Sequence, residues 1–193
     1  QYGISRSSVF SMLKRFGIPT RTIASSHIQY PRSSFSGDLV EKAYLIGFTL
    51  GDLRVRNHNK IKSETISIAC GSTKQAQIDL IENLFSSYGR VWKGKKSKKG
   101  VINVEAFVDR SFEFLLPDKR DYNWSAKNKK QFFSFLAGFT DAEGSFYVSN
   151  GRAFAAWGNY NTEVLTFIRD SLTAFGIDVP KMYCDKLKGT IAS

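Results

Sequence analysis

The sequence predicts an α+β protein built as a pseudo-two-fold pair of αββαββα repeats, and two observations support this. An apolar segment that ends in a carboxylate, Leu45–Asp52, returns as Leu136–Glu143. After each copy, the apolar periodicity changes from helical to strand-like and back to helical. Two equivalent acids indicate carboxylates that meet near an axis of pseudo-symmetry, where they can hold metal ions for phosphodiester hydrolysis.

The first repeat is expected over residues 38–117. It opens with a helix that Asp38 is suited to cap and that runs to Asp52. Further periodicities and turn residues predict the remaining elements in this order: a strand hairpin over 53–71, a helix over 75–88, a second hairpin over 90–108 and a short helix over 111–116.

The second repeat is expected over residues 129–193, after a polar connector over 118–128. Its predicted elements are a helix over 128–143, strands within 145–159, a helix over 162–175 and a strand over 179–184. It is shorter than the first repeat, so we expect it to lack its last strand and terminal helix.

The N-terminal segment, residues 1–18, has the pattern of a short amphipathic helix with Ser5 as its N-cap. Its Gly-Ile-Ser start resembles the turn and second helix of a DNA-reading helix-turn-helix; an ordinary amphipathic helix is the alternative. Residues 19–37 are rich in Ser, Pro and Gly, which is typical of a linker. Within it, Arg21 and Arg32 either follow a phosphate backbone or are solvated.

The charge of the chain favours a polyanionic partner. Lys and Arg together number 28 against 17 acids, giving a net charge of +11. Nucleic acid is the first candidate; a membrane surface is disfavoured because no apolar run of about 18 residues exists. Cys70 and Cys184 form no disulfide framework or zinc pattern, so an intracellular location is expected, in the cytoplasm of a prokaryote or in an organelle.

The two acid-ending segments resemble the motif of the LAGLIDADG homing endonucleases, in their single-chain form with two repeats. The resemblance implies two saddle-shaped antiparallel sheets that straddle duplex DNA, with the motif helices packed at the centre. It implies that Asp52 and Glu143 are the catalytic acids and metal ligands, with main-chain carbonyls of Gly51 and Ala142 as further ligands. The expected cofactor is Mg²⁺, with Ca²⁺ as a substitute that does not support cutting.

The resemblance also implies which side chains contact DNA, because strand residues alternate between the DNA and the helices. In the first half the candidates are Arg54, Arg56, Asn57, His58, Lys60, Lys62, Glu64 and Ser67. In the second half they are Tyr147, Ser149, Arg152, Trp157 and Asn159. Lys93, Lys95 and the lysines that follow are expected to contact phosphates, or else to form a solvated hairpin tip or a targeting patch.

The sequence departs from the family around the metals, where a polar and a basic residue are expected. Approximate alignment places Cys70 or Gly71, and Trp157 or Gly158, at the polar positions, and Phe107 at a basic one. Lys186 or Lys188 is the candidate for a basic group in the second half. Asp141 is interpreted as a helix-end or DNA-side residue, because it lies about 100° around the helix from Glu143.

Three functions are compatible with this pattern. The first is a site-specific, double-strand DNA endonuclease that acts as a monomer on a long target, more in the manner of an intron-encoded enzyme than of an intein-borne one. The second is a splicing maturase that binds intron RNA. The third is a DNA-binding regulator that does not cut.

Overall fold

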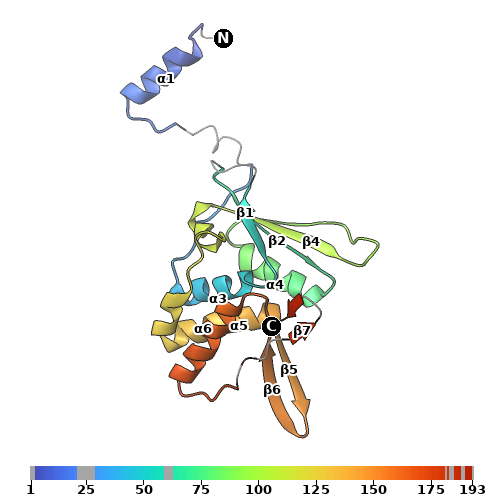
Figure 1. The fold of residues 1–193 in the computed structure, drawn as a ribbon. Coiled ribbons are helices and arrows are strands. Elements are labelled where there is room, and N and C mark those ends of the chain that lie inside the picture. Colours follow the sequence, from blue (N-terminus) through green and yellow to red (C-terminus); the bar gives the residue numbers. More distant parts are fainter. Residues whose placement is uncertain are drawn as a thin grey trace.

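The computed structural model describes residues 3–20, 29–58, 63–180, 182, 185–187 and 190–192 (Figure 1). Helices and antiparallel sheets follow one another as the α+β prediction requires. Within the described residues, no helix is both long and apolar enough to cross a membrane.

The first unit is a four-stranded sheet with helices packed on one side. Its elements are α3 Leu39–Thr49, β1 Arg54–Asn57, β2 Ile66–Ser72, α4 Gln75–Phe85, β3 Arg90–Lys93, β4 Ile102–Val108 and the 3-10 helix η1 Arg110–Leu115. The strands pair antiparallel in the order β1-β2-β4-β3. Alternate residues such as Val55, Ile68 and Ala106 are buried on the helix side, and their neighbours line the open side.

The cap predicted for the first helix of this unit is present. The Asp38 carboxylate accepts hydrogen bonds from the backbone N–H groups of Val40 and Glu41, at 2.7 and 3.4 Å, at the start of α3. Such a bond satisfies amides that have no partner within the helix. The apolar stripe of α4 buries Ile78, Ile81 and Phe85 against the sheet, as its helical spacing predicts.

The second unit repeats the order of the first, a helix, two strands, a helix and two strands, so the last strand that it was expected to lack is present. Its elements are the 3-10 helix η2 Asn123–Lys127, α5 Lys129–Glu143, β5 Gly144–Ser149, β6 Arg152–Trp157, α6 Thr162–Ala174, β7 Asp185–Leu187 and β8 Thr190–Ala192. The strands β5 and β6 form one two-stranded sheet, and β7 and β8 form another. The β5–β6 hairpin projects from the helices at the bottom of Figure 1, and within the described residues it pairs with no third strand.

One strand prediction was wrong and one helix was missed. The strand expected over 179–184 does not include Val179, Pro180 or Met182; a strand begins instead at Asp185. Pro180 has no N–H to donate to a sheet, which explains why pairing does not start there. The 3-10 helix η2 forms inside the predicted polar connector, where the Tyr122 carbonyl accepts a bond from the Ser125 N–H at 3.0 Å.

The N-terminal helix α1, Arg6–Arg15, has Ser5 as its N-cap, as predicted, and the Ser5 hydroxyl accepts a bond from the Ser8 N–H at 3.1 Å. None of its residues is buried, so its apolar stripe faces no core. Gly17, at φ 65°, follows the helix in a conformation that suits glycine.

The end of the predicted linker is attached to the first unit. The Arg32 guanidinium donates to the Glu64 carbonyl at 2.8 Å, the Thr65 hydroxyl at 2.7 Å and the Val108 carbonyl at 3.2 Å. Phe35 packs edge-on against Phe112, with ring centroids 5.4 Å apart. Arg32 therefore fixes the chain to the end of the sheet. The linker-like composition of residues 19–37 did not predict this role.

Candidate metal and nucleic-acid site

The two motif helices, α3 and α5, touch through their glycines at the centre of the molecule. A Cβ added to Gly47 would lie 2.0 Å from the Phe135 carbonyl oxygen, and one added to Gly138 would lie 2.0 Å from the Tyr44 carbonyl oxygen. The two contacts are equivalent, because Gly47 and Gly138 are 91 positions apart, as are Tyr44 and Phe135. The two helices therefore contact each other in a pseudo-symmetric way, as the repeated motif predicts.

The same crossing brings the two motif ends together. Glu143 is the last residue of α5, and Asp52 lies in the turn that follows α3. A Cβ on Gly51 would lie 2.6 Å from the Ala142 Cβ, 2.6 Å from the Glu143 Cγ and 3.0 Å from the Glu143 Oε1. The Glu143 carboxylate therefore rests against the residue that precedes Asp52.

Electrostatics also indicate that the two acids are close. Burial raises the pKa of Glu143 above its usual range, and the negative charge of Asp52 raises it further, while a hydrogen bond from Asn159 acts in the opposite direction. Two neighbouring carboxylates that both remain charged favour a cation between them. The donor set is therefore suited to a divalent metal ion.

Each acid accepts a hydrogen bond from one side-chain amide. Gln77, in the first turn of α4, donates to Asp52 Oδ2, and Asn159 Nδ2 donates to Glu143 Oε1 at 3.2 Å. The described residues donate no hydrogen bond to the other oxygen of either carboxylate, so Asp52 Oδ1 and Glu143 Oε2 can meet a metal ion.

The polar residues next to the acids are not those that the sequence alignment suggested. Gln77 was missed, because it lies on the helix after the strand to which the alignment pointed. Asn159 was predicted to contact DNA, but its amide contacts Glu143. Cys70 lies on the buried face of β2, where burial and then the charge of Asp52 raise the pKa of its thiol to about 11. Gly71 lies on the open face.

The described residues supply no further charged partner at this centre. None of their ion pairs involves Asp52 or Glu143. They also contain no group of three or more His, Cys, Asp or Glu side chains that could hold a metal ion. A metal here would need oxygen ligands besides these two acids. Lys186 and Lys188 are not tested, since side chains there lie outside what the structure describes.

The open face of the first sheet carries the predicted arginines. Arg54 and Arg56 are exposed on β1, on the same side as Ser67 and Phe107 in the neighbouring strands. Glu105 of β4 lies among them and accepts bonds from the Ser67 hydroxyl and from Arg56, the latter at 3.4 Å. A cationic, hydrogen-bonding sheet face of this kind suits the major groove of DNA.

His58 and Phe107 meet at the end of this face. Their rings are nearly perpendicular, with centroids 5.1 Å apart. Phe107 therefore supplies an aromatic surface where the alignment expected a basic group. Glu64 precedes β2, and Lys95 is exposed in the β3–β4 loop. Lys60 and Lys62 lie outside the described residues.

Three residues predicted to contact DNA lie on the helix side of their sheets. Lys93 Nζ forms an ion pair with Glu82 Oε2 of α4 at 2.8 Å. Trp157 Nε1 donates to the Thr140 hydroxyl of α5 at 2.7 Å. Asn57 of β1 lies opposite the buried Ile66 of β2 in the sheet, so both are on the same face. Successive strand residues point to opposite faces of a sheet, so the immediate neighbours of these residues along the strand point to the open face instead.

Asn57 also carries a buried polar atom without a partner. Its side-chain Oδ1 accepts no hydrogen bond from any residue in the described parts of the chain.

The second sheet presents a more aromatic open face. Tyr147 and Phe154 lie opposite each other on β5 and β6, and their rings stack with centroids 5.3 Å apart at 13°. Ser149 and Arg152 form the next pair along the same face. All four side chains are exposed, which leaves them accessible to a ligand.

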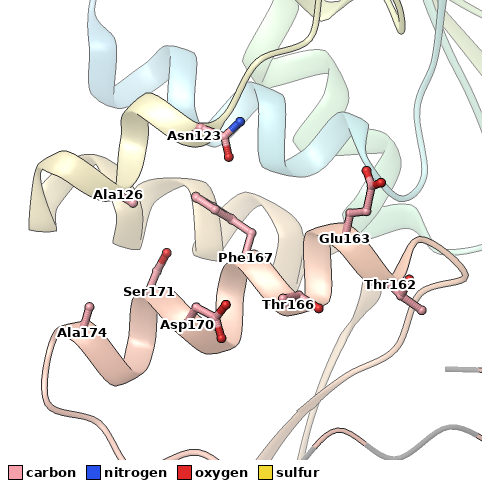
Figure 2. A pocket seen from close by; sticks show the side chains of 9 residues that line it. All are labelled: Asn123, Ala126, Thr162, Glu163, Thr166, Phe167, Asp170, Ser171 and Ala174. Atoms are coloured by element: carbon pink, nitrogen blue, oxygen red, sulfur yellow. The ribbon is translucent and has the colours of Figure 1, made fainter.

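A separate pocket of about 590 Å³ lies between η2 and α6 and is shown in Figure 2. Its lining includes Asn123, Phe167 and the acidic side chains of Glu163 and Asp170. None of the site residues predicted from the sequence contributes to it. The acidic walls do not suit a polyanion, so the pocket plays no part in the proposals below.

Comparisons with known proteins agree with this geometry at the level of fold. No family model matches the sequence, and no curated protein matches it. The structure is similar to I-DmoI in complex with DNA and Mn, at 15% identity and a TM-score of 0.51, over 72% of this chain and 78% of that one. Mesophilic variants of the homing endonuclease I-DmoI give 16% identity and a TM-score of 0.50, over 72% and 79% of the two chains.

A third similar structure is the N-terminal LAGLIDADG domain of DUF199/WhiA. It gives 18% identity and a TM-score of 0.50, over 90% of this chain and 83% of that one. The chain therefore has the LAGLIDADG fold, and the resemblance inferred from its motifs is confirmed. More particularly, its fold is similar both to that of the homing endonuclease I-DmoI and to that of the WhiA domain.

Proposed function

We propose that the protein is a site-specific, double-strand DNA endonuclease that uses a divalent metal ion. The observation that carries this proposal is the contact between the two motif ends, where Glu143 rests on Gly51 beside Asp52. The pseudo-symmetry of the two acids matches the approximate two-fold symmetry of a DNA duplex. The structural likeness to I-DmoI bound to DNA and Mn supports the same assignment.

The acids would hold the metal through the oxygens that accept no hydrogen bond from the described residues. Main-chain carbonyls of Gly51 and Ala142 are proposed as further ligands. The ion, which we propose to be Mg²⁺, would supply the chemistry of water activation and of stabilising the leaving oxygen. Gln77 and Asn159 would orient the two carboxylates, and the other oxygen of each accepts no hydrogen bond from the part of the chain that the structure describes.

DNA would bind across the open faces of the two sheets. Arg54 and Arg56 would read bases from the first sheet, and Arg152 from the second. Lys95 and its neighbouring lysines are exposed and suit contacts with phosphate. One chain supplies both acids, which supports cutting by a monomer. We further propose that α1, with Arg6, Lys14 and Arg15 exposed, binds DNA beside the sheets.

The proposal is tested with a pool of randomised duplex DNA. The protein is bound to the pool with Ca²⁺, the retained duplexes are recovered, and Mg²⁺ is then added. We expect a long, nearly two-fold target that is cut near its centre. Failure to retain any duplex would overturn the DNA-binding proposal and make intron RNA, the ligand of a splicing maturase, the next one to test.

A second candidate is a DNA-binding regulator that does not cut. Two observations favour it: none of the described cationic side chains pairs with either acid, and the likeness extends to the LAGLIDADG domain of WhiA. In the same experiment a regulator would select a defined duplex that stays intact after Mg²⁺ is added.

A further inference from the structure

One polar contact joins the two motif helices beside the acid of the second motif. The Tyr44 hydroxyl, on α3, donates a hydrogen bond to Asp141 Oδ2, on α5, at 2.6 Å. Asp141 lies in the last turn of α5, two residues before Glu143. Burial, followed by this bond, raises the pKa of the Tyr44 hydroxyl above its usual range, so the hydroxyl remains a donor at neutral pH.

The pseudo-symmetry of the fold shows that this contact has no counterpart. Positions 91 residues apart are equivalent, so Phe135 corresponds to Tyr44 and Leu50 corresponds to Asp141. Neither side chain has an atom that can form a hydrogen bond. Phe135 is fully buried and stacks on Tyr122, with centroids 5.5 Å apart. The hydrogen bond therefore fixes the end of α5 alone.

The two acids are consequently held in different ways. Each carboxylate is bonded directly by one amide, that of Gln77 or Asn159, but the backbones differ. Asp52 lies beyond the end of α3, in a turn. Glu143 is part of a helix whose last turn is hydrogen-bonded to two neighbouring elements. The Trp157 indole bonds Thr140 from β6, and the Tyr44 hydroxyl bonds Asp141 from α3. The position of Glu143 thus depends on the end of its helix.

We propose that Tyr44 is a positioning residue, which acts through Asp141 to hold Glu143 in the geometry needed to cut one strand of the duplex. This inference rests on the proposed endonuclease function. The two acids are related by pseudo-symmetry, as are the two strands of DNA, so a loosened Glu143 slows the cut of one strand more than the other. The product that accumulates is nicked duplex.

The test compares Tyr44→Phe with Tyr88→Phe. The Tyr88 hydroxyl donates an equivalent bond to Glu41 Oε1 at 2.7 Å, so both variants lose one tyrosine–carboxylate hydrogen bond, and only the first lies at the motif interface. Nicked and fully cut duplex are measured over time on the target selected above. We expect Tyr44→Phe to slow the second cut roughly fivefold, as the loss of one hydrogen bond predicts, and Tyr88→Phe to leave the ratio of the two cuts unchanged.

A second pair of variants separates positioning from general destabilisation. Asp141→Asn keeps an oxygen that accepts the Tyr44 hydrogen bond, whereas Asp141→Ala removes it. We expect Asn to retain nearly equal cutting of both strands and Ala to accumulate nicked duplex as Tyr44→Phe does. Equal nicking by the Asn and Ala variants would overturn the proposal, because the hydrogen bond would then not be the cause.

Amide hydrogen exchange, measured without metal or DNA, tests the contact independently of cutting. Exchange over Thr140–Gly144 should accelerate in Tyr44→Phe and stay at the wild-type rate in Tyr88→Phe. If the wild-type protein cuts no DNA, the endonuclease proposal fails, while the exchange result still decides whether Tyr44 holds the helix end. If it cuts and Tyr44→Phe gives the same strand ratio as Tyr88→Phe, the positioning role is refuted.

Discussion

Replacing Gly138 with alanine should destabilise the protein, although the same change in an ordinary helix would stabilise it. Alanine is favoured over glycine within helices by about 1 kcal/mol. At Gly138 the new Cβ would lie 2.0 Å from the Tyr44 carbonyl oxygen and 3.0 Å from the Phe48 nitrogen. Both are backbone atoms, so no side-chain rotation can relieve the clash.

The size of the effect follows from that distance. Close carbon–oxygen contacts lie at about 3.3–3.6 Å, so α3 and α5 must separate by more than about 1 Å. Overpacking of a core typically costs about 1–3 kcal/mol, and more when the backbone has to move. After the gain in helix propensity is subtracted, we expect the free energy of unfolding to fall by about 2 kcal/mol.

Urea denaturation of Gly138→Ala and Ala137→Gly measures both terms. Ala137 is the exposed neighbour of Gly138 in the same helix, so Ala137→Gly reports helix propensity alone and should cost about 1 kcal/mol. A Gly138→Ala variant that is as stable as the wild type, or more stable, with an unchanged denaturant slope, would refute the close packing of the motif helices.

Two further predictions concern pH. The Cys70 thiol has a pKa of about 11, so at pH 8 it should react with iodoacetamide far more slowly than a free thiol, and the rate should rise as the pH approaches 11. The rate is measured in a Cys184→Ser variant, in which Cys70 is the remaining cysteine. Labelling at the rate of an ordinary cysteine would contradict the burial of Cys70. Burial raises the pKa of Asp109, but bonds from Ser111 and Ser34 and the charge of Arg32 outweigh it and hold the pKa below its usual range. Its stabilisation should be present above about pH 4, the ordinary aspartate value, and lost as pH falls through the lower folded value. Asp109→Ala should cost about 1 kcal/mol at pH 7, and a pH dependence of unfolding equal to that of the wild type would refute this role.

The sequence predicted the elements that local signals define. The Asp38 cap and the apolar stripe of α4 gave the starts of these helices correctly, while both helices end three residues earlier than predicted, at Thr49 and Phe85. The acids at the ends of the two motifs predicted that these ends lie close together, because a repeated pattern implies equivalent places in a pseudo-symmetric fold. Asp141 was the exception within the motif: its place on the helix was clear, but its partner Tyr44 could be found only by packing α3 against α5.

The sequence did not determine which strand residues face DNA. A change of one residue in register exchanges the two faces of a strand, and Asn57 and Trp157 lie on the helix side for this reason. Lys93, which was predicted to contact phosphate, pairs with Glu82. Gln77 illustrates a different limit: it approaches Asp52 from a helix 25 positions along the chain. No periodicity connects such a pair, which only the tertiary fold brings together.

The most direct test of the central claim uses Asp52→Asn and Glu143→Gln on the selected duplex. Both substitutions keep the size and hydrogen-bonding shape of the side chain and remove its charge, so DNA binding in Ca²⁺ should persist. Because the metal is proposed to be held between the two carboxylates, we predict that each substitution abolishes double-strand cutting in Mg²⁺. Double-strand cutting at the wild-type rate by both variants would contradict a two-acid metal centre at this helix crossing.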